Sequence, residues 1–133
     1  MESQKIIHVE ISVGELMDKI TILEIKKQRI LDANKRRNVC CELEALYAAR
    51  ECSVPRIPEL ERCVAELRTT NEIVWRIEDD IRDCERRQDF GAHFIELARA
   101  VYRNNDRRAA IKRSINELVG SRLVEEKSYS AYD

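Results

Sequence analysis

Apolar residues recur along most of the chain at the three- and four-residue spacing of amphipathic helices. The first such stretch predicts a helix over residues 13–31. Ser12 can cap the free amide of Glu15, and the Glu15 side chain can reach back to the amide of Ser12, which is the pattern of a capping box. The apolar residues of this helix fall on two sides, which indicates burial between neighbouring elements.

Three further helices follow from the same periodicity. One is expected over residues 35–51, with Asn34 as its N-cap. Another is expected over residues 58–87, because it begins with a proline, which suits a first helical turn. The last starts after the turn at Gly91 and ends at Gly120, a predicted left-handed C-cap. The last two helices are long and joined by a short turn, so they should form an antiparallel hairpin.

Before the first helix, residues 6–13 alternate apolar and polar side chains, which predicts a short strand with one buried face. The apolar positions are Ile7, Val9, Ile11 and Val13. A lone strand leaves its backbone groups unpaired, so it needs a partner. The other candidate strand is the tail, residues 123–129. The two can pair within one chain or across two chains of a dimer.

Each long helix has a polar interruption in its apolar stripe. Thr70 and Asn71 interrupt one, and Asn104, Asn105 and Arg108 interrupt the other. In an antiparallel hairpin, residues equally distant from the turn face each other. The two interruptions are therefore expected to meet in one polar layer.

This layer is the candidate binding site. Its residues are Asn71, Asn104, Asn105, Asp106, Arg108 and Lys112. The amides offer donors and acceptors, and the Arg and Lys side chains suit a carboxylate or phosphate anion. Two structural interpretations stand beside this one. Either Asn104 or Asn105 caps a new helix with Asp106 at its N-terminus, or the layer fixes the register of the two helices.

Composition excludes several classes of protein. Charged residues make up 37% of the 133 residues, yet the net charge is −1, so nucleic-acid binding is not expected. No apolar run approaches the length of a membrane span, and the N-terminal residues lack the apolar core of a signal peptide. The five cysteines include no C-x-x-C pair, which favours reduced thiols. We expect a cytoplasmic protein with no membrane association.

Catalytic and metal-binding motifs are not found. The two histidines, His8 and His93, are not in the Glu-x-x-His spacing of a di-iron site, and no glycine-rich phosphate loop is present. Asp79 and Asp83 could share a helical face and bind a hard cation. Arginines interleave with them, however, which is typical of a solvated face. We expect no cofactor and no metal, and we favour a non-enzyme.

Three segments resemble an uncharacterised bacterial family, a domain of unknown function. They are ISVGELMDKITILEIK, VWRIEDDIRDCE and FIELARAVYRNNDRRAAIKRSINELVGSRLVEEKSY. The resemblance covers nearly the whole chain except about residues 32–58. The family is associated with tetratricopeptide-repeat proteins and with glycosyltransferase or surface-polysaccharide genes. It implies a bacterial, cytoplasmic, helical protein and supplies no catalytic residues.

Together these observations predict a single, mainly α domain over residues 1–133. The fold is an antiparallel helical bundle with a long helical hairpin and a short N-terminal strand, for which the C-terminal tail is the candidate partner. We expect a homodimer, because long helices in a thin hairpin leave apolar flanks uncovered. The favoured function is non-catalytic binding or scaffolding, with another protein as a further partner. The alternative is a small-ligand-binding protein or enzyme with an anion site at the polar layer.

Overall fold

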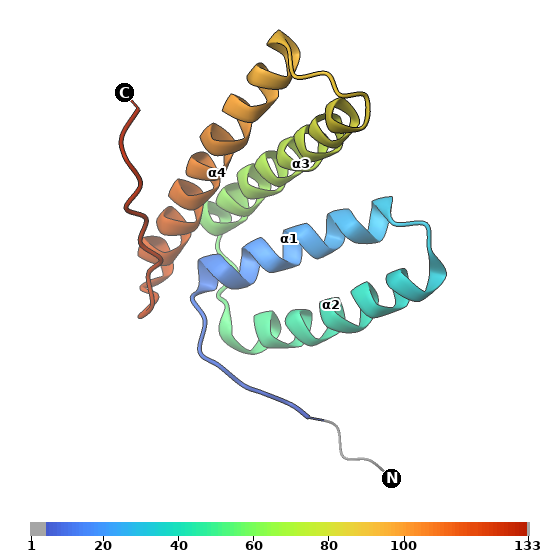
Figure 1. The fold of residues 1–133 in the computed structure, drawn as a ribbon. Coiled ribbons are helices and arrows are strands. Elements are labelled where there is room, and N and C mark those ends of the chain that lie inside the picture. Colours follow the sequence, from blue (N-terminus) through green and yellow to red (C-terminus); the bar gives the residue numbers. More distant parts are fainter. Residues whose placement is uncertain (1–4, 133) are drawn as a thin grey trace.

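The computed structural model describes residues 5–132, which form four helices joined by short loops (Figure 1). These are α1 (Val13–Arg29), α2 (Ala33–Ser53), α3 (Pro58–Arg86) and α4 (Ala92–Val119). Helices α1 and α2 form one antiparallel hairpin, and α3 and α4 form a second, longer one. Helix α1 lies between α2 and the longer hairpin, and it packs against all three other helices. None of the described helices is both long and apolar enough to cross a membrane.

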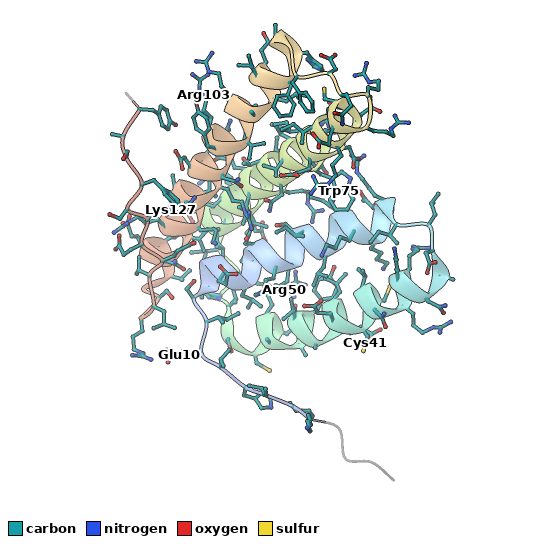
Figure 2. All side chains as sticks on the ribbon, in the orientation of Figure 1. Glu10, Cys41, Arg50, Trp75, Arg103 and Lys127 are labelled. Carbon is teal, nitrogen blue, oxygen red and sulfur yellow. The ribbon has the colours of Figure 1, made fainter. Side chains whose placement is uncertain are left out.

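The main core surrounds α1, whose Leu16, Ile20 and Leu23 are almost completely buried. The other helices contribute Val39, Leu43, Leu60, Leu67, Ile111 and Ile115 to the same cluster. Side chains fill the space between the ribbons (Figure 2). Full burial of each large aliphatic side chain contributes roughly 1.5–3 kcal/mol. This cluster therefore holds α1 onto the rest of the molecule. A smaller cluster lies where the α3–α4 hairpin extends past α1, and consists of Ile77, Cys84 and Leu97.

The starts of the first two helices are fixed by side-chain caps. Ser12 accepts a hydrogen bond from the amide of Glu15 at 3.1 Å, which confirms this cap. The cap predicted at Asn34 is wrong: α2 begins earlier, and the carboxylate of Asp32 accepts from the amide of Lys35 at 2.9 Å. Asp and Asn are both good N-cap residues. Because the helix begins at Ala33, the preceding residue, Asp32, is the N-cap.

The long helices end in left-handed residues. Gly120 has φ 69°, which confirms the C-cap predicted there. After α3, Gln88 has φ 56° and its amide donates to the carbonyl of Glu85 at 3.0 Å, while the amide of Asp89 donates to the carbonyl of Cys84 at 2.9 Å. These bonds form a Schellman motif, which reverses the chain within a few residues. The predicted antiparallel α3–α4 hairpin is confirmed.

The strand predicted over residues 6–13 is wrong. Among the described residues, those before α1 belong to no strand, and Ile7 and Val9 are 86% and 73% exposed. The physical reason lies in the proposed partner. The tail, residues 121–132, turns back along α4, where side-chain ion pairs hold it (Figure 1). The arm before α1 and the tail share one described ion pair, between Glu10 and Arg122, and form no backbone ladder.

Candidate functional site

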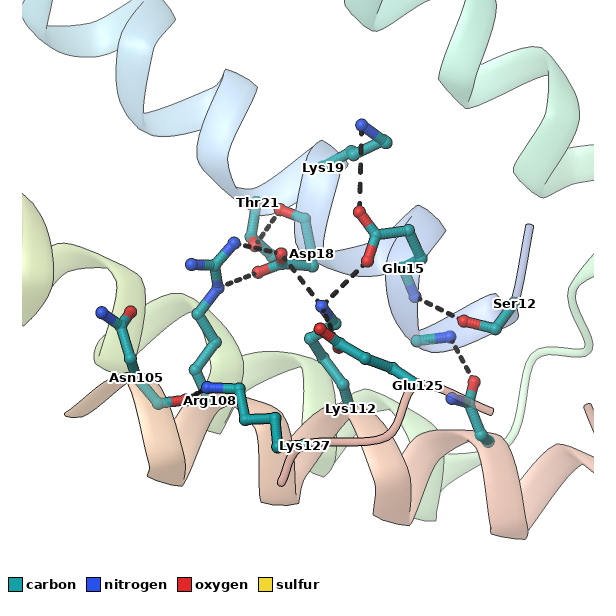
Figure 3. Close-up of polar contacts among 12 residues, drawn as sticks. Ser12, Glu15, Asp18, Lys19, Thr21, Asn105, Arg108, Lys112, Glu125 and Lys127 are labelled. Carbon is teal, nitrogen blue, oxygen red and sulfur yellow. Dashed lines mark hydrogen bonds and ion pairs between the residues drawn. The ribbon is translucent and has the colours of Figure 1, made fainter. Parts of the chain in front are cut away.

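The carboxylate of Asp18 is the centre of a polar layer in the main core. The residue is 1% exposed. Its carboxylate accepts two hydrogen bonds from Arg108 on α4, one of them from Nε at 2.9 Å, in a bidentate arrangement (Figure 3). It also accepts a bond from Nδ2 of Asn71 on α3 at 3.0 Å. Asp18 thereby joins three helices through charge-assisted bonds, which are stronger than neutral ones.

Thr21 completes the buried side of this layer. Its hydroxyl donates to the carbonyl of Asp18 at 2.9 Å and accepts from Nδ2 of Asn71 at 2.9 Å. No buried side-chain nitrogen or oxygen in the described residues lacks a hydrogen-bond partner. An unsatisfied polar group in the core would cost about 1–3 kcal/mol, so this full pairing allows the layer to exist inside an apolar core.

Lys112 extends the layer toward the tail. Its side chain is only 8% exposed, and its ammonium lies 2.8 Å from Glu15, 2.7 Å from Glu125 and 3.8 Å from Asp18. Burial acts to lower the pKa of Lys112, but hydrogen bonds to Glu125 and Glu15 more than offset it, so the pKa is raised. The side chain is therefore a buried cation. In the predicted capping box, Glu15 was expected to reach the Ser12 amide, but it pairs with Lys112 and Lys19 instead.

Arg108 is also held as a cation. Its pKa is raised, mainly by its hydrogen bonds to Asp18 and also by the nearby carboxylates of Glu15 and Glu125. Its side chain remains 29% exposed. The Nε and Nη2 edge of the guanidinium therefore binds Asp18 in the core, while another part of the side chain reaches the surface.

A glycine brings α1 and α4 close enough for these contacts. The amide of Gly14 donates to Oδ1 of Asn116 at 2.7 Å. A Cβ atom at Gly14 would lie 2.5 Å from the carbonyl oxygen of Lys112, which is too close for any side chain. One turn further along α1, this close crossing places Asp18 within reach of Arg108.

The tail covers the outer side of the layer. Glu125 pairs with Lys112, and Glu126 pairs with Arg113 at 3.1 Å. Lys127 lies 3.7 Å from Asp106 of α4. The tail is thus held mainly by ion pairs between charged side chains.

Between α4 and the tail lies a cleft of about 450 Å³. It is lined by Val101, Tyr102, Asn105, Asp106, Arg108, Ala109, Lys112, Glu125, Lys127 and Tyr129. Its volume is within the range of small-ligand pockets, about 300–1,000 Å³. Four of the six predicted site residues line it, and a fifth, Asn71, contacts the layer behind it.

The sixth predicted residue, Asn104, takes no part. Its side chain donates to the carbonyl of Ala100 in its own helix at 2.8 Å. Thr70 likewise donates to Glu66 at 2.9 Å. Helix α4 is continuous, so the interpretation of a new helix starting at Asn104 or Asn105 is wrong. The two interruptions are connected, but through Asp18 of a third helix: Asn71 and Arg108 both bind its carboxylate.

A second polar group joins α1 to α2 and α3. The carboxylate of Glu24 accepts from the hydroxyl of Tyr47 at 2.7 Å and pairs with Arg68. Burial, and next the hydrogen bond to Glu24, raises the pKa of Tyr47 to about 12. Arg50 stacks over the Tyr47 ring at 4.5 Å.

Sequence reasoning missed the residues that α1 contributes. Gly14, Asp18 and Thr21 are spaced by four and three residues, so they share one helical face. These three residues are small or polar, yet all three are buried, whereas the charged residues Glu15 and Lys19 lie on another side of the helix. Such a stripe was the available signal that α1 meets a polar partner.

Comparison with known proteins gives a family and no assigned activity. No curated protein and no solved structure matches the chain. The model of a family of unknown function, DUF6165, matches residues 7–132. That range includes all four helices, the polar layer and the tail up to Tyr132. The chain belongs to the DUF6165 family of unknown function.

Proposed function

We propose that the chain is a non-catalytic helical binding or scaffold protein. One observation carries this proposal: the ionisable side chains of the polar layer are committed to one another. Asp18 is held by Arg108, and Lys112 lies between Glu15 and Glu125. A catalytic acid or base needs a proton it can exchange with substrate, and buried ion pairs do not provide one. The family resemblance suggests the more specific form of this role, in surface-polysaccharide or glycosyltransferase systems of the bacterial cytoplasm.

The arm before α1 is the surface we propose for self-association. Ile6, Ile7 and Val9 are 68%, 86% and 73% exposed. Several large apolar side chains exposed within residues 6–9 are unusual on an isolated protein, whereas single exposed residues such as Leu31 are normal. A second copy of the chain, bound through this arm, would remove them from water.

Gel filtration with light scattering tests this homodimer. The full chain is expected to be a dimer at micromolar concentration, and the double variant Ile7→Ser/Val9→Ser a monomer. Leu31→Ser is the matched control, because it removes an equally exposed side chain from a loop elsewhere, and it should remain dimeric. A monomeric wild-type chain, or a dimeric arm variant, would contradict the proposal. Far-ultraviolet circular dichroism should show equal helicity in all three.

A second candidate function is binding of a small ligand in the cleft between α4 and the tail. The observation that favours it is the meeting there of Asn105, Asp106, Arg108 and Lys112 beside the tail. A thermal-shift screen with nucleotide sugars, sugar phosphates, dicarboxylates and neutral sugars tests it. A ligand of the cleft should raise the melting temperature of the wild type but not of Asn105→Ala. No shift with any compound would count against this candidate.

A further inference from the structure

The polar atoms of the cleft that are still free decide what it can bind. Arg108 uses Nε and Nη2 on Asp18, and its Nη1 has no bond to any described residue. The side-chain amide of Asn105 has none either. Figure 3 shows both side chains extending from α4, with the guanidinium of Arg108 bonded to Asp18. One donor of Arg108 and the Asn105 amide are therefore available in the lining of the cleft.

The charges around the cleft disfavour an anion. Three cations, Arg108, Lys112 and Lys127, are accompanied by four carboxylates. These are Glu15, Asp18, Asp106 and Glu125, each of which pairs with at least one of the three cations. A phosphate would meet cations that each already have at least one carboxylate partner, so the anion expected from Arg108 and Lys112 alone is not favoured.

The free groups include both donors and acceptors. Glu125 uses one carboxylate oxygen on Lys112, and Asp106 uses one on Lys127, so each keeps a second oxygen. Arg108 and the Asn105 amide supply donors. An oxyanion can use only donors, and an ammonium group only acceptors. A hydroxyl group both donates and accepts hydrogen bonds. A ligand with several hydroxyl groups therefore matches a cleft that offers both donors and acceptors.

Aromatic side chains line the same cleft. Tyr102 and Tyr129 are both part of its lining. The Tyr102 ring is braced by the ring of Tyr132, with centroids 5.2 Å apart. The ammonium of Lys127 lies 5.8 Å from the Tyr129 ring. Tyrosine combines a flat apolar face with a polar hydroxyl, so it suits a ligand that has apolar C–H faces and polar edges.

We propose that the cleft between α4 and the tail binds a neutral, ring-shaped, hydroxyl-rich ligand, a saccharide unit. Asn105 and Arg108 bind its hydroxyl groups together with Asp106 and Glu125, and Tyr129 covers one of its faces. This inference rests on the second candidate function and names its ligand class. The cleft is partly open to solvent, and Tyr129 in its lining is 83% exposed, so the expected affinity for a single sugar unit is millimolar.

Titration of the isotope-labelled full chain, followed by amide chemical shifts, tests this inference. The probes are D-glucose, D-galactose, D-mannose, maltose and inorganic phosphate, each up to about 0.1 M, far above a millimolar dissociation constant. At least one neutral sugar should shift amides of residues 101–112 and 125–129 in a saturable manner. Asn105→Ala and Tyr129→Ala should each weaken that binding about tenfold or more.

Asn104→Ala is the matched control. Its amide is bonded to its own helix, so the variant should bind the sugar as the wild type does. Saturable shifts with phosphate and with none of the sugars would overturn the neutral-ligand inference while leaving a ligand site in place. No saturable shift with any probe, together with no hit in the thermal-shift screen, would overturn the site itself.

Discussion

Replacing Asp18 by Asn is the most direct test of the polar layer as the lock between α1 and the α3–α4 hairpin. The side chains are nearly equal in size, so packing is preserved while the central charge is lost. Asp18 is 1% exposed, and it faces Arg108, 29% exposed, and Lys112, 8% exposed. Removing one partner from a fully buried ion pair costs about 3–5 kcal/mol, whereas an exposed pair is worth about 0–1 kcal/mol.

The expected loss for Asp18→Asn lies near the lower end of the buried range, at about 3 kcal/mol. Arg108 can regain part of its solvation because it reaches the surface, and Lys112 keeps Glu15 and Glu125. Urea unfolding followed by circular dichroism measures this loss as a shift of the midpoint at unchanged slope. Asp106→Asn is the matched control. Its one described ion pair, to Lys127, is 3.7 Å long and partly exposed, so the expected change is below about 0.5 kcal/mol.

The double variant Asp18→Asn/Arg108→Met separates the ion pair from other effects of each substitution. If the two residues stabilise the fold through their mutual contact, the double variant should lose at least about 1 kcal/mol less than the sum of the single variants. Losses that simply add, or a loss below about 1 kcal/mol for Asp18→Asn, would refute the role assigned to this layer.

Two further predictions concern the contacts of α1 with its neighbours: the close approach of Gly14 to α4, and the hydrogen bond from Tyr47 of α2 to Glu24 of α1. Gly14→Ala should destabilise the fold by about 1–3 kcal/mol in the same urea assay, because its Cβ would lie 2.5 Å from the Lys112 carbonyl of another helix. Gly91→Ala, whose nearest contact would be 3.4 Å, should cost less. For Tyr47, the folded-state pKa of about 12 exceeds the ordinary value of 10.0. The stability that its protonated hydroxyl contributes to the fold is therefore fully present below pH 10 and is lost as the pH rises toward 12. Tyrosinate absorbance should show a late-titrating group that is lost in Tyr47→Phe and kept in the control variant Tyr129→Phe.

The helices were predictable because their signals are local. The cap at Ser12, the left-handed Gly120 and the apolar periodicity act within a few residues of one another, so the neighbouring sequence largely determines them. A strand depends on a partner supplied from elsewhere. The alternation over residues 6–13 is real, but within one chain the tail that could have paired with it is held on α4 by ion pairs. The local pattern therefore could not decide the outcome.

The candidate site was only half predictable for a similar reason. Asn71, Arg108 and Lys112 were identifiable because polar side chains at apolar-stripe positions indicate a buried partner. The partner itself, Asp18, comes from a helix 90 residues away from Arg108 in sequence. Its position depends on how α1 crosses the hairpin, which in turn depends on the close approach at Gly14. The way two helices cross depends on how their side chains pack together, so it cannot be predicted from the apolar periodicity of one helix.

The contribution of α1 also changes the chemistry of the cleft. Considered on α4 alone, Arg108 and Lys112 are two cations one helical turn apart, and an anion site is the natural interpretation. Once α1 is in place, Asp18 and Glu15 neutralise both and leave Arg108 a single free donor edge. The contacts that fix the fold therefore also determine the charge and the free hydrogen-bonding groups of the cleft. Residues that never face a ligand, Asp18 above all, decide which ligands the surface beside them can accept.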